Sequence, residues 1–139
     1  MSVGILTLAD VIEGLTGDRP EGLIQPVSKT VIDSRQTKSG ALFVAFRGEH
    51  ADGHDYVADA FSRGAVAAIV DRDVGISATT LDLTGPAQAW PASWSLPLVL
   101  EVEDSLQAIQ RVAGFWRRQH LVRVVGITGS VGKTTTKEL

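Results

Sequence analysis

The feature that most constrains the fold is a glycine-rich turn near the end of the sequence. An apolar run over residues 121–125 leads into residues 126–132, which contain three glycines and are followed by Lys133 and three threonines. A strand that enters such a loop presents backbone amides to nucleotide phosphates, while the lysine adds a positive charge and the next hydroxyl holds Mg²⁺. The pattern therefore predicts a strand from residue 122 that opens a nucleotide-binding domain.

The spacing of this loop departs from the strict pattern G-x-x-x-x-G-K-[ST]. The first glycine would fall at Ile127, and Gly126 comes one residue too early. The alternative is an ordinary turn before a helix, with Lys133 in solvent. We favour phosphate binding because the loop follows an apolar run and ends in Gly-Lys-Thr. The sequence stops about where the next helix should begin, so we expect the remainder of this domain to be missing.

Composition excludes several classes of protein. Hydrophobic residues make up 44% of the sequence, charged residues make up 21%, and the net charge is −3. These values are ordinary for a soluble domain and argue against nucleic acid or an anionic membrane as the main partner. The absence of cysteine excludes disulfides and cysteine metal sites. Neither a signal peptide nor a membrane-spanning run is evident, so we expect a cytoplasmic protein without membrane insertion.

Apolar periodicity predicts alternating strands and helices. We expect helices over residues 8–15, 56–63 and 104–119, capped by Thr7, by Asp55 and by Asp104 or Ser105. Strands are expected over residues 27–32, 41–46, 65–70 and 98–102. Residues 72–97 are rich in glycine and proline and contain either a short strand near residues 80–83 or an insertion. The order indicates a small α/β layer.

Two polar segments are candidate sites. Asp33-Ser34-Arg35 follows a predicted strand, so it is either an Asx turn with a surface salt bridge or a ligand site in which Arg35 lies near a phosphate. His50 and His54 are four residues apart, but an intervening glycine disfavours a helical metal site, and a ligand loop is the better interpretation. The three tryptophans are expected in the core or as its cover.

Together these segments resemble the Mur ligases, a family that builds peptidoglycan precursors. The resemblance is carried by ordered blocks of sequence, which are Asp33-Ser34-Arg35, residues 39–45, Asp52-Gly53-His54-Asp55-Tyr56, residues 64–68 and residues 126–135. Residues 72–97 match no block of the family that we can identify. Val131 stands where the family usually has asparagine, which leaves the phosphate cradle of backbone amides intact.

The resemblance implies a fold and a division into domains. It implies an α/β fold with a small N-terminal UDP-binding domain of mixed sheet and helices. The first strand and phosphate loop of a truncated central domain would follow. Residues 1–103 would bind a UDP-MurNAc-peptide, residues 104–121 would form a connecting helix, and residues 122–139 would begin the ATP-binding domain.

The resemblance also implies site residues. The UDP moiety would contact Ile32, Ser34, Glu49, His50 and Ala51, to which we add Arg35 for its charge. ATP would bind Gly129, Ser130, Val131, Gly132, Lys133, Thr134 and Thr135. Lys133 and Thr134 would serve catalysis, and Thr134 would hold Mg²⁺ through ATP.

The implied activity is ATP-dependent amide formation through an acyl phosphate. The tail from residue 129 most resembles the family member that joins D-Ala-D-Ala to UDP-MurNAc-tripeptide. We expect a monomer whose partners are these two substrates and the central and C-terminal domains, and we expect the 139 residues alone to be inactive. Three alternatives stay open: the family member that adds the third peptide residue, a stand-alone UDP-sugar binding module, and an unrelated phosphate-loop NTPase.

Overall fold

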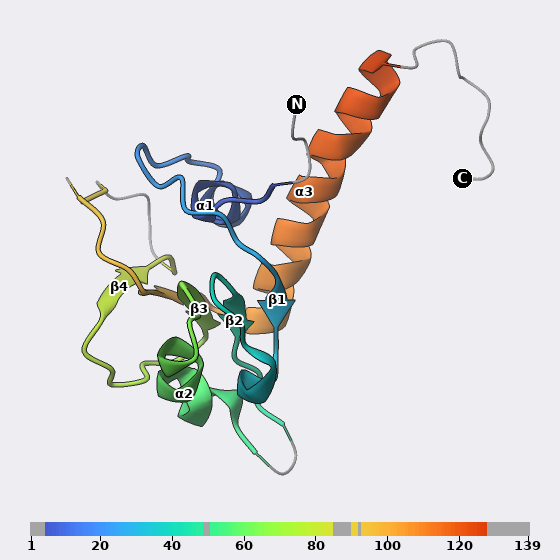
Figure 1. The fold of residues 1–139 in the computed structure, drawn as a ribbon. Coiled ribbons are helices and arrows are strands. Elements are labelled where there is room, and N and C mark those ends of the chain that lie inside the picture. Colours follow the sequence, from blue (N-terminus) through green and yellow to red (C-terminus); the bar gives the residue numbers. More distant parts are fainter. Residues whose placement is uncertain (1–4, 49–50, 85–89, 92, 128–139) are drawn as a thin grey trace.

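The computed structural model describes residues 5–48, 51–84, 90–91 and 93–127, with the backbone alone for residues 119–127 (Figure 1). The chain combines helices with a parallel sheet, which confirms the predicted α/β class. The elements are α1 (Leu8–Thr16), β1 (Thr30–Val31), the 3₁₀ turn η1 (Ser34–Gln36), β2 (Leu42–Val44), the 3₁₀ turn η2 (Gly53–Tyr56), α2 (Val57–Ser62), β3 (Ala67–Val70), β4 (Thr79–Asp82), β5 (Leu98–Glu101) and α3 (Ser105–Ile127).

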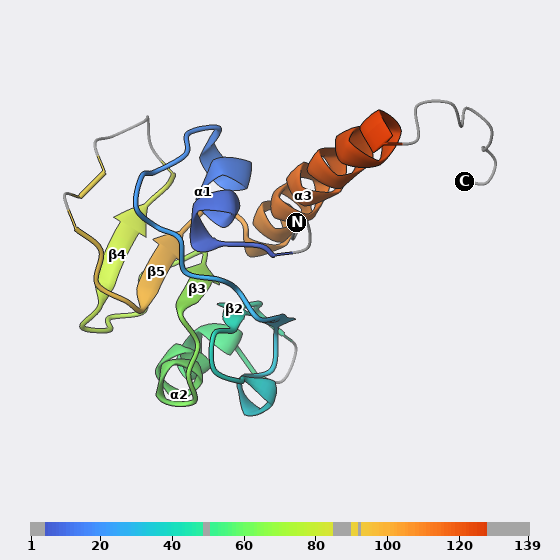
Figure 2. The ribbon, with the colours of Figure 1, turned by 45° about the horizontal axis from the view of Figure 1, so that its top comes forward.

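Five strands form one sheet in the order β1-β2-β3-β5-β4. All four pairings among the described strands are parallel, where a mixed sheet was predicted. Because parallel strands end on the same edge of a sheet, the segments that follow β1, β2 and β3 meet at its carboxyl edge. Helices α1 and α3 cover one face and α2 covers the other (Figures 1 and 2).

Strand β2 shows how the sheet is buried on both faces. Leu42 and Val44 pack into the core beneath α1 and α3, whereas Phe43 packs into the core beneath α2. All three side chains are fully buried. A continuous apolar run is what a parallel strand covered on both faces requires, because successive side chains point to opposite faces.

Local hydrogen bonds set the helix ends largely as predicted. Thr7 caps α1 in a capping box, since its Oγ1 accepts from Asp10 N at 3.2 Å and Asp10 Oδ2 accepts from Thr7 N at 2.9 Å. Gly17 ends the helix in a left-handed conformation with φ of 84°. Asp104 caps α3, where its Oδ1 accepts from Gln107 N at 2.9 Å.

The start of the second helical segment differs from the prediction. Asp52, not Asp55, is the capping residue, because its Oδ1 accepts from His54 N at 2.9 Å. The chain first makes the 3₁₀ turn η2, and only then the short α2. Cap prediction failed here because several Asp residues stand close together and any of them satisfies the sequence rule.

The strand predicted from residue 122 is a further difference. Helix α3 continues to Ile127, beyond the predicted end near residue 119. A short apolar run fits a strand or a buried helix equally well by its composition. Among the described strands none pairs with this segment, so the helical hydrogen bonds of α3 persist through it. In Figures 1 and 2 the C-terminal half of α3 extends beyond the sheet.

The segment that was hardest to predict contributes an edge strand and a cover. Strand β4 confirms the short strand expected near residues 80–83. Trp90 and Trp94 lie against the core beneath α1 with their ring centroids 6.3 Å apart. Trp94 Nε1 donates to Glu21 O at 3.0 Å. Both tryptophans therefore cover the core, as predicted.

Candidate functional site

A cavity of about 870 Å³ opens beyond the carboxyl ends of β1 and β2, on the face that α2 covers. This volume falls in the range of small-molecule sites. Three segments supply its walls: the turn η1, the segment 46–53, and the end of η2 with α2. The lining residues are Ile32, Asp33, Ser34, Arg35, Phe43, Phe46, Gly48, Ala51, Gly53, Tyr56 and Asp59.

The η1 wall is shaped by Asp33. Its Oδ1 accepts from Arg35 N at 3.0 Å, which closes the turn, and its Oδ2 lies 2.8 Å from Arg35 Nη2. The hydrogen bonds from Arg35 hold the pKa of Asp33 below its usual value. The two alternatives for Asp33-Ser34-Arg35 are therefore compatible: the segment forms an Asx turn with a salt bridge, and it also lines the cavity. The guanidinium of Arg35 remains at the cavity mouth, with 80% of its side chain exposed.

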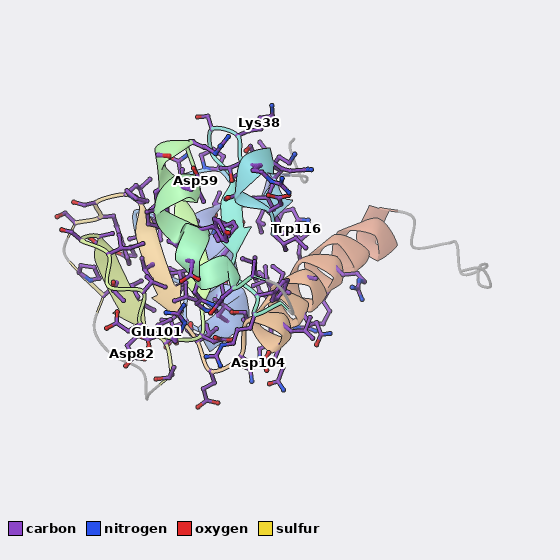
Figure 3. The ribbon with its side chains drawn as sticks, turned by 90° about the horizontal axis from the view of Figure 1, so that it is seen from below. Lys38, Asp59, Asp82, Glu101, Asp104 and Trp116 are labelled. Carbon is purple, nitrogen blue, oxygen red and sulfur yellow. The ribbon has the colours of Figure 1, made fainter. Side chains whose placement is uncertain are left out.

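Ser34 and Asp59 meet where η1 lies against α2. Ser34 is buried, at 5% exposure. The neighbouring Ser34 hydroxyl and a hydrogen bond from Arg63 Nε at 3.0 Å lower the pKa of Asp59. Figure 3 shows Asp59 on α2 beside η1. The pair places an ionised carboxylate on the cavity wall.

Apolar side chains supply much of the remaining lining. Phe43 is fully buried beneath the cavity, while Ile32 and Tyr56 are 63% and 45% exposed. Large apolar side chains in solvent at the rim of a cavity are typical of a ligand site. The cavity can therefore accept a flat apolar ring with a few polar atoms on its edge.

Residues 46–48 and 51–53 lie close together, and the glycines among them are required by close backbone contacts. Gly53 N donates to Phe46 O at 2.7 Å, and Gly48 N donates to Ala51 O at 2.9 Å. A Cβ on Gly48 would lie 2.8 Å from Ala51 O, and one on Gly53 would lie 2.9 Å from Phe46 N. These distances exclude any larger residue without a backbone shift.

His54 joins this loop to the end of β3. Its side chain is fully buried, Nδ1 lies 2.7 Å from Asp52 Oδ1, and Nε2 accepts from Asp71 N at 3.0 Å. Because Nε2 accepts, Nδ1 carries the hydrogen and donates to Asp52. Asp52 also receives Arg72 Nη2 at 3.0 Å, and the His54 amide, His54 ring and Arg72 together lower its pKa well below 3.8.

Comparisons with known proteins agree with this architecture. The model of the "Mur ligase family, catalytic domain" matches residues 26–93, which span the cavity segments and β4. The chain belongs to the Mur ligase family. The match also includes most of residues 72–97, the segment in which we had identified no family block. It ends before the glycine loop.

Individual relatives place this Mur ligase chain more closely. It is 39% identical over 114 residues to a UDP-N-acetylmuramoyl-tripeptide–D-alanyl-D-alanine ligase from Synechocystis, covering 81% of this chain and 21% of that protein. It is 32% identical over 119 residues to a UDP-N-acetylmuramoyl-L-alanyl-D-glutamate–2,6-diaminopimelate ligase from Aquifex aeolicus, covering 84% and 21%. The chain thus spans about a fifth of these relatives.

A solved structure shares the fold. The UDP-N-acetylmuramoylalanyl-D-glutamyl-2,6-diaminopimelate–D-alanyl-D-alanyl ligase from Acinetobacter baumannii aligns with a TM-score of 0.51 and 23% identity. The alignment covers 86% of this chain and 23% of that structure. The likeness confirms the fold of a Mur ligase N-terminal domain.

The structure brings together the predicted UDP residues that it describes. Ile32, Ser34, Arg35 and Ala51 all line the cavity. Glu49 and His50 lie outside the described residues, as does the whole predicted ATP site. That site comprises Gly129, Ser130, Val131, Gly132, Lys133, Thr134 and Thr135. The geometry of the Mur ligase cavity therefore bears on the N-terminal site alone.

Sequence reasoning missed several lining residues of this Mur ligase domain. Tyr56 belonged to a recognised block but was not singled out as a site residue. Asp59 was missed entirely, since nothing marks one acidic residue on a short helix until the helix is seen against η1. One sequence signal was available for this part of the lining. The two glycines at positions 48 and 53 flank a polar segment, which is a pattern that predicts a loop near a ligand.

In the described part of this Mur ligase chain, no group of three or more His, Asp or Glu side chains has the geometry to hold a metal ion. His54 instead has protein partners on both ring nitrogens. Within the same residues, no helix is long and apolar enough to cross a membrane.

Proposed function

We propose that this chain is the substrate-binding N-terminal part of a ligase that joins D-Ala-D-Ala to UDP-MurNAc-tripeptide, and that its cavity binds the UDP moiety. The single observation that carries the proposal is the coincidence of Ile32, Ser34, Arg35 and Ala51 in one cavity. These residues come from two separate segments of the sequence, and the family resemblance assigns three of them to the uridine nucleotide.

The chemistry of the cavity supports a nucleotide. Ile32 and Tyr56 offer apolar surface for a ring, and the exposed guanidinium of Arg35 offers hydrogen-bond donors for phosphate at the mouth. Glu49 and His50 would complete the site from the loop between Gly48 and Ala51. We propose a cytoplasmic, monomeric protein, in keeping with its composition.

Catalysis would depend on ATP and on the rest of the protein. Members of the Mur ligase family are ATP-dependent ligases, and ATP is the phosphoryl donor that the implied acyl phosphate needs. We assign Gly129, Ser130, Val131, Gly132 and Thr135 to its phosphates. Lys133 would neutralise the developing charge, and Thr134 would bind Mg²⁺. This assignment rests on the sequence pattern. We further propose that the 139 residues alone do not catalyse ligation, because they span about a fifth of the relatives.

Calorimetric titration of UDP-MurNAc-tripeptide into the 139-residue chain tests the binding site. We expect saturable binding that UDP competes away. Ile32→Glu should abolish it, because a carboxylate would replace the apolar surface that we assign to the ring, while the fold should persist because Ile32 is 63% exposed. Ile24→Glu is the matched control, since Ile24 is 79% exposed and lies outside the cavity lining. Absence of binding at millimolar ligand would overturn the assignment.

The family member that adds the third peptide residue is the second candidate. It is favoured by the match to the Aquifex aeolicus relative, whose identity of 32% approaches that of the first relative. The complete protein separates the two functions. We expect phosphate release with UDP-MurNAc-tripeptide and D-Ala-D-Ala, whereas release with UDP-MurNAc-dipeptide and a diamino acid would support the alternative.

A further inference from the structure

Asp59 presents a hydrogen-bond acceptor on the wall that η1 and α2 form. Ser34 and Asp59 both line the cavity there. Asp59 is acceptor-only when ionised, and the neighbouring Ser34 hydroxyl and the hydrogen bond from Arg63 Nε keep its pKa low. The Asp59 carboxylate therefore accepts hydrogen bonds and does not donate them.

Backbone donors around the cavity are also committed. The amide of Arg35 donates to Asp33, and the amides of Gly48 and Gly53 donate to carbonyls of their own loop. The cation on the η1 wall is Arg35, which is bonded to Asp33 through Nε and Nη2 and points largely into solvent. Phosphate and carbonyl oxygens of a ligand can therefore accept hydrogen bonds from Arg35 at the mouth of the cavity. Near Asp59, a ligand can form a hydrogen bond to the carboxylate only by donating an N–H or O–H.

We propose that Asp59 is a specificity-determining residue that accepts the N3–H of the uracil ring. This inference rests on the proposed function, and it adds which edge of the ligand is recognised. A carboxylate has about four lone-pair sites. Arg63 Nε, at 3.0 Å from Oδ2, occupies part of this capacity, which leaves room for a further donor. Uracil offers one ring N–H between two carbonyls. A site built around such a donor rejects an analogue that lacks it.

The test compares UDP with N3-methyl-UDP, which replaces that hydrogen with a methyl group. Calorimetry on the 139-residue chain should show N3-methyl-UDP binding ~10- to 100-fold more weakly than UDP, the range for a lost hydrogen bond to a charged group. Asp59→Ala should weaken UDP by a similar factor and remove most of the discrimination, because the acceptor is gone. Circular dichroism spectra and melting curves would report whether each variant is folded.

Asp55→Ala is the matched control. It removes the same charge one helical turn earlier, from a residue that pairs with Arg72 at 3.3 Å and lies outside the cavity lining. We expect it to keep the full discrimination between the two nucleotides. Equal affinity of the unmodified chain for both, or unchanged discrimination in Asp59→Ala, would overturn the role of Asp59 while leaving the UDP site standing. Failure of UDP itself to bind would overturn both proposals.

Discussion

His54 provides the sharpest test of how the loop at the cavity is held. Its two ring nitrogens bond to partners in different environments: Asp52 is 30% exposed, whereas the Asp71 amide belongs to the end of a buried strand. Two substitutions separate these bonds. His54→Asn puts an amide nitrogen near the position of Nδ1 and keeps the bond to Asp52. His54→Gln puts an amide oxygen near the position of Nε2 and keeps the bond from Asp71 N.

The two variants should differ in stability in a fixed order. His54→Asn leaves a backbone N–H without its acceptor, which costs about 1–3 kcal/mol when the group is shielded from water. His54→Gln removes the bond to Asp52, but water reaches that carboxylate and Arg72 still pairs with it, so the loss is about 0.5–1.5 kcal/mol. Urea denaturation of the chain, analysed at constant m-value, measures both differences.

The order of the urea midpoints of His54→Asn and His54→Gln shows which bond of His54 holds the loop. If His54→Gln proves as destabilising as His54→Asn, the link to β3 does not hold the loop, and our account of this histidine is wrong. Because Gly48, Ala51 and Gly53 line the cavity, the same variants should also weaken UDP binding in that order. Ser62→Ala is a suitable control on the same segment, since its hydroxyl bonds only to the exposed turn of α2.

Four other substitutions address the fold. Thr7→Ala should lower the free energy of unfolding by about 1 kcal/mol through loss of the α1 cap, as read from the urea midpoint. Gly64→Ala should cost at least about 2 kcal/mol, because φ is +112° and a Cβ would lie 2.8 Å from Ser39 Cα. Gly17→Ala, with φ of +84° and open space, should cost about 1 kcal/mol in the same denaturation series. The pKa of Asp52 is lowered on folding, so its stabilisation is full above its unfolded value of 3.8 and is lost as the pH falls below it. Asp52→Asn should therefore make the free energy of unfolding, measured by urea denaturation from about pH 2 to 6, depend less steeply on pH.

The fold was largely predictable because its signals are local. Thr7, Gly17 and Asp104 act within one turn of their helices, and the apolar run at residues 41–46 admits burial on both faces. Strand pairing is different, since nothing in the sequence states that β5 inserts between β3 and β4. The strand predicted from residue 122 was wrong for a related reason. Whether this apolar segment forms a strand or a helix depends on its neighbours and not on its own composition.

The site was predictable only where the resemblance supplied it. The residues Asp33-Ser34-Arg35 by themselves allowed either a surface salt bridge or a ligand site, and the salt bridge is present. Its functional meaning depends on Asp59, which lies 25 residues from Ser34 in the sequence and reaches it only through the packing of α2 on η1. Long-range pairs of this kind are invisible to periodicity and spacing. The same limit applies to the bond between His54 and the end of β3.

The block from Asp52 to Tyr56 combines structural and ligand-facing roles within five residues. Asp52 caps the turn, Gly53 permits close backbone contact, and His54 ties the loop to β3. Tyr56 has 45% of its surface exposed and lines the cavity. The first three residues therefore shape the loop, and the aromatic ring of Tyr56 lines the cavity that the loop helps to form. Substitutions in the first three should therefore change stability and nucleotide affinity together, whereas Tyr56→Ala should change affinity alone.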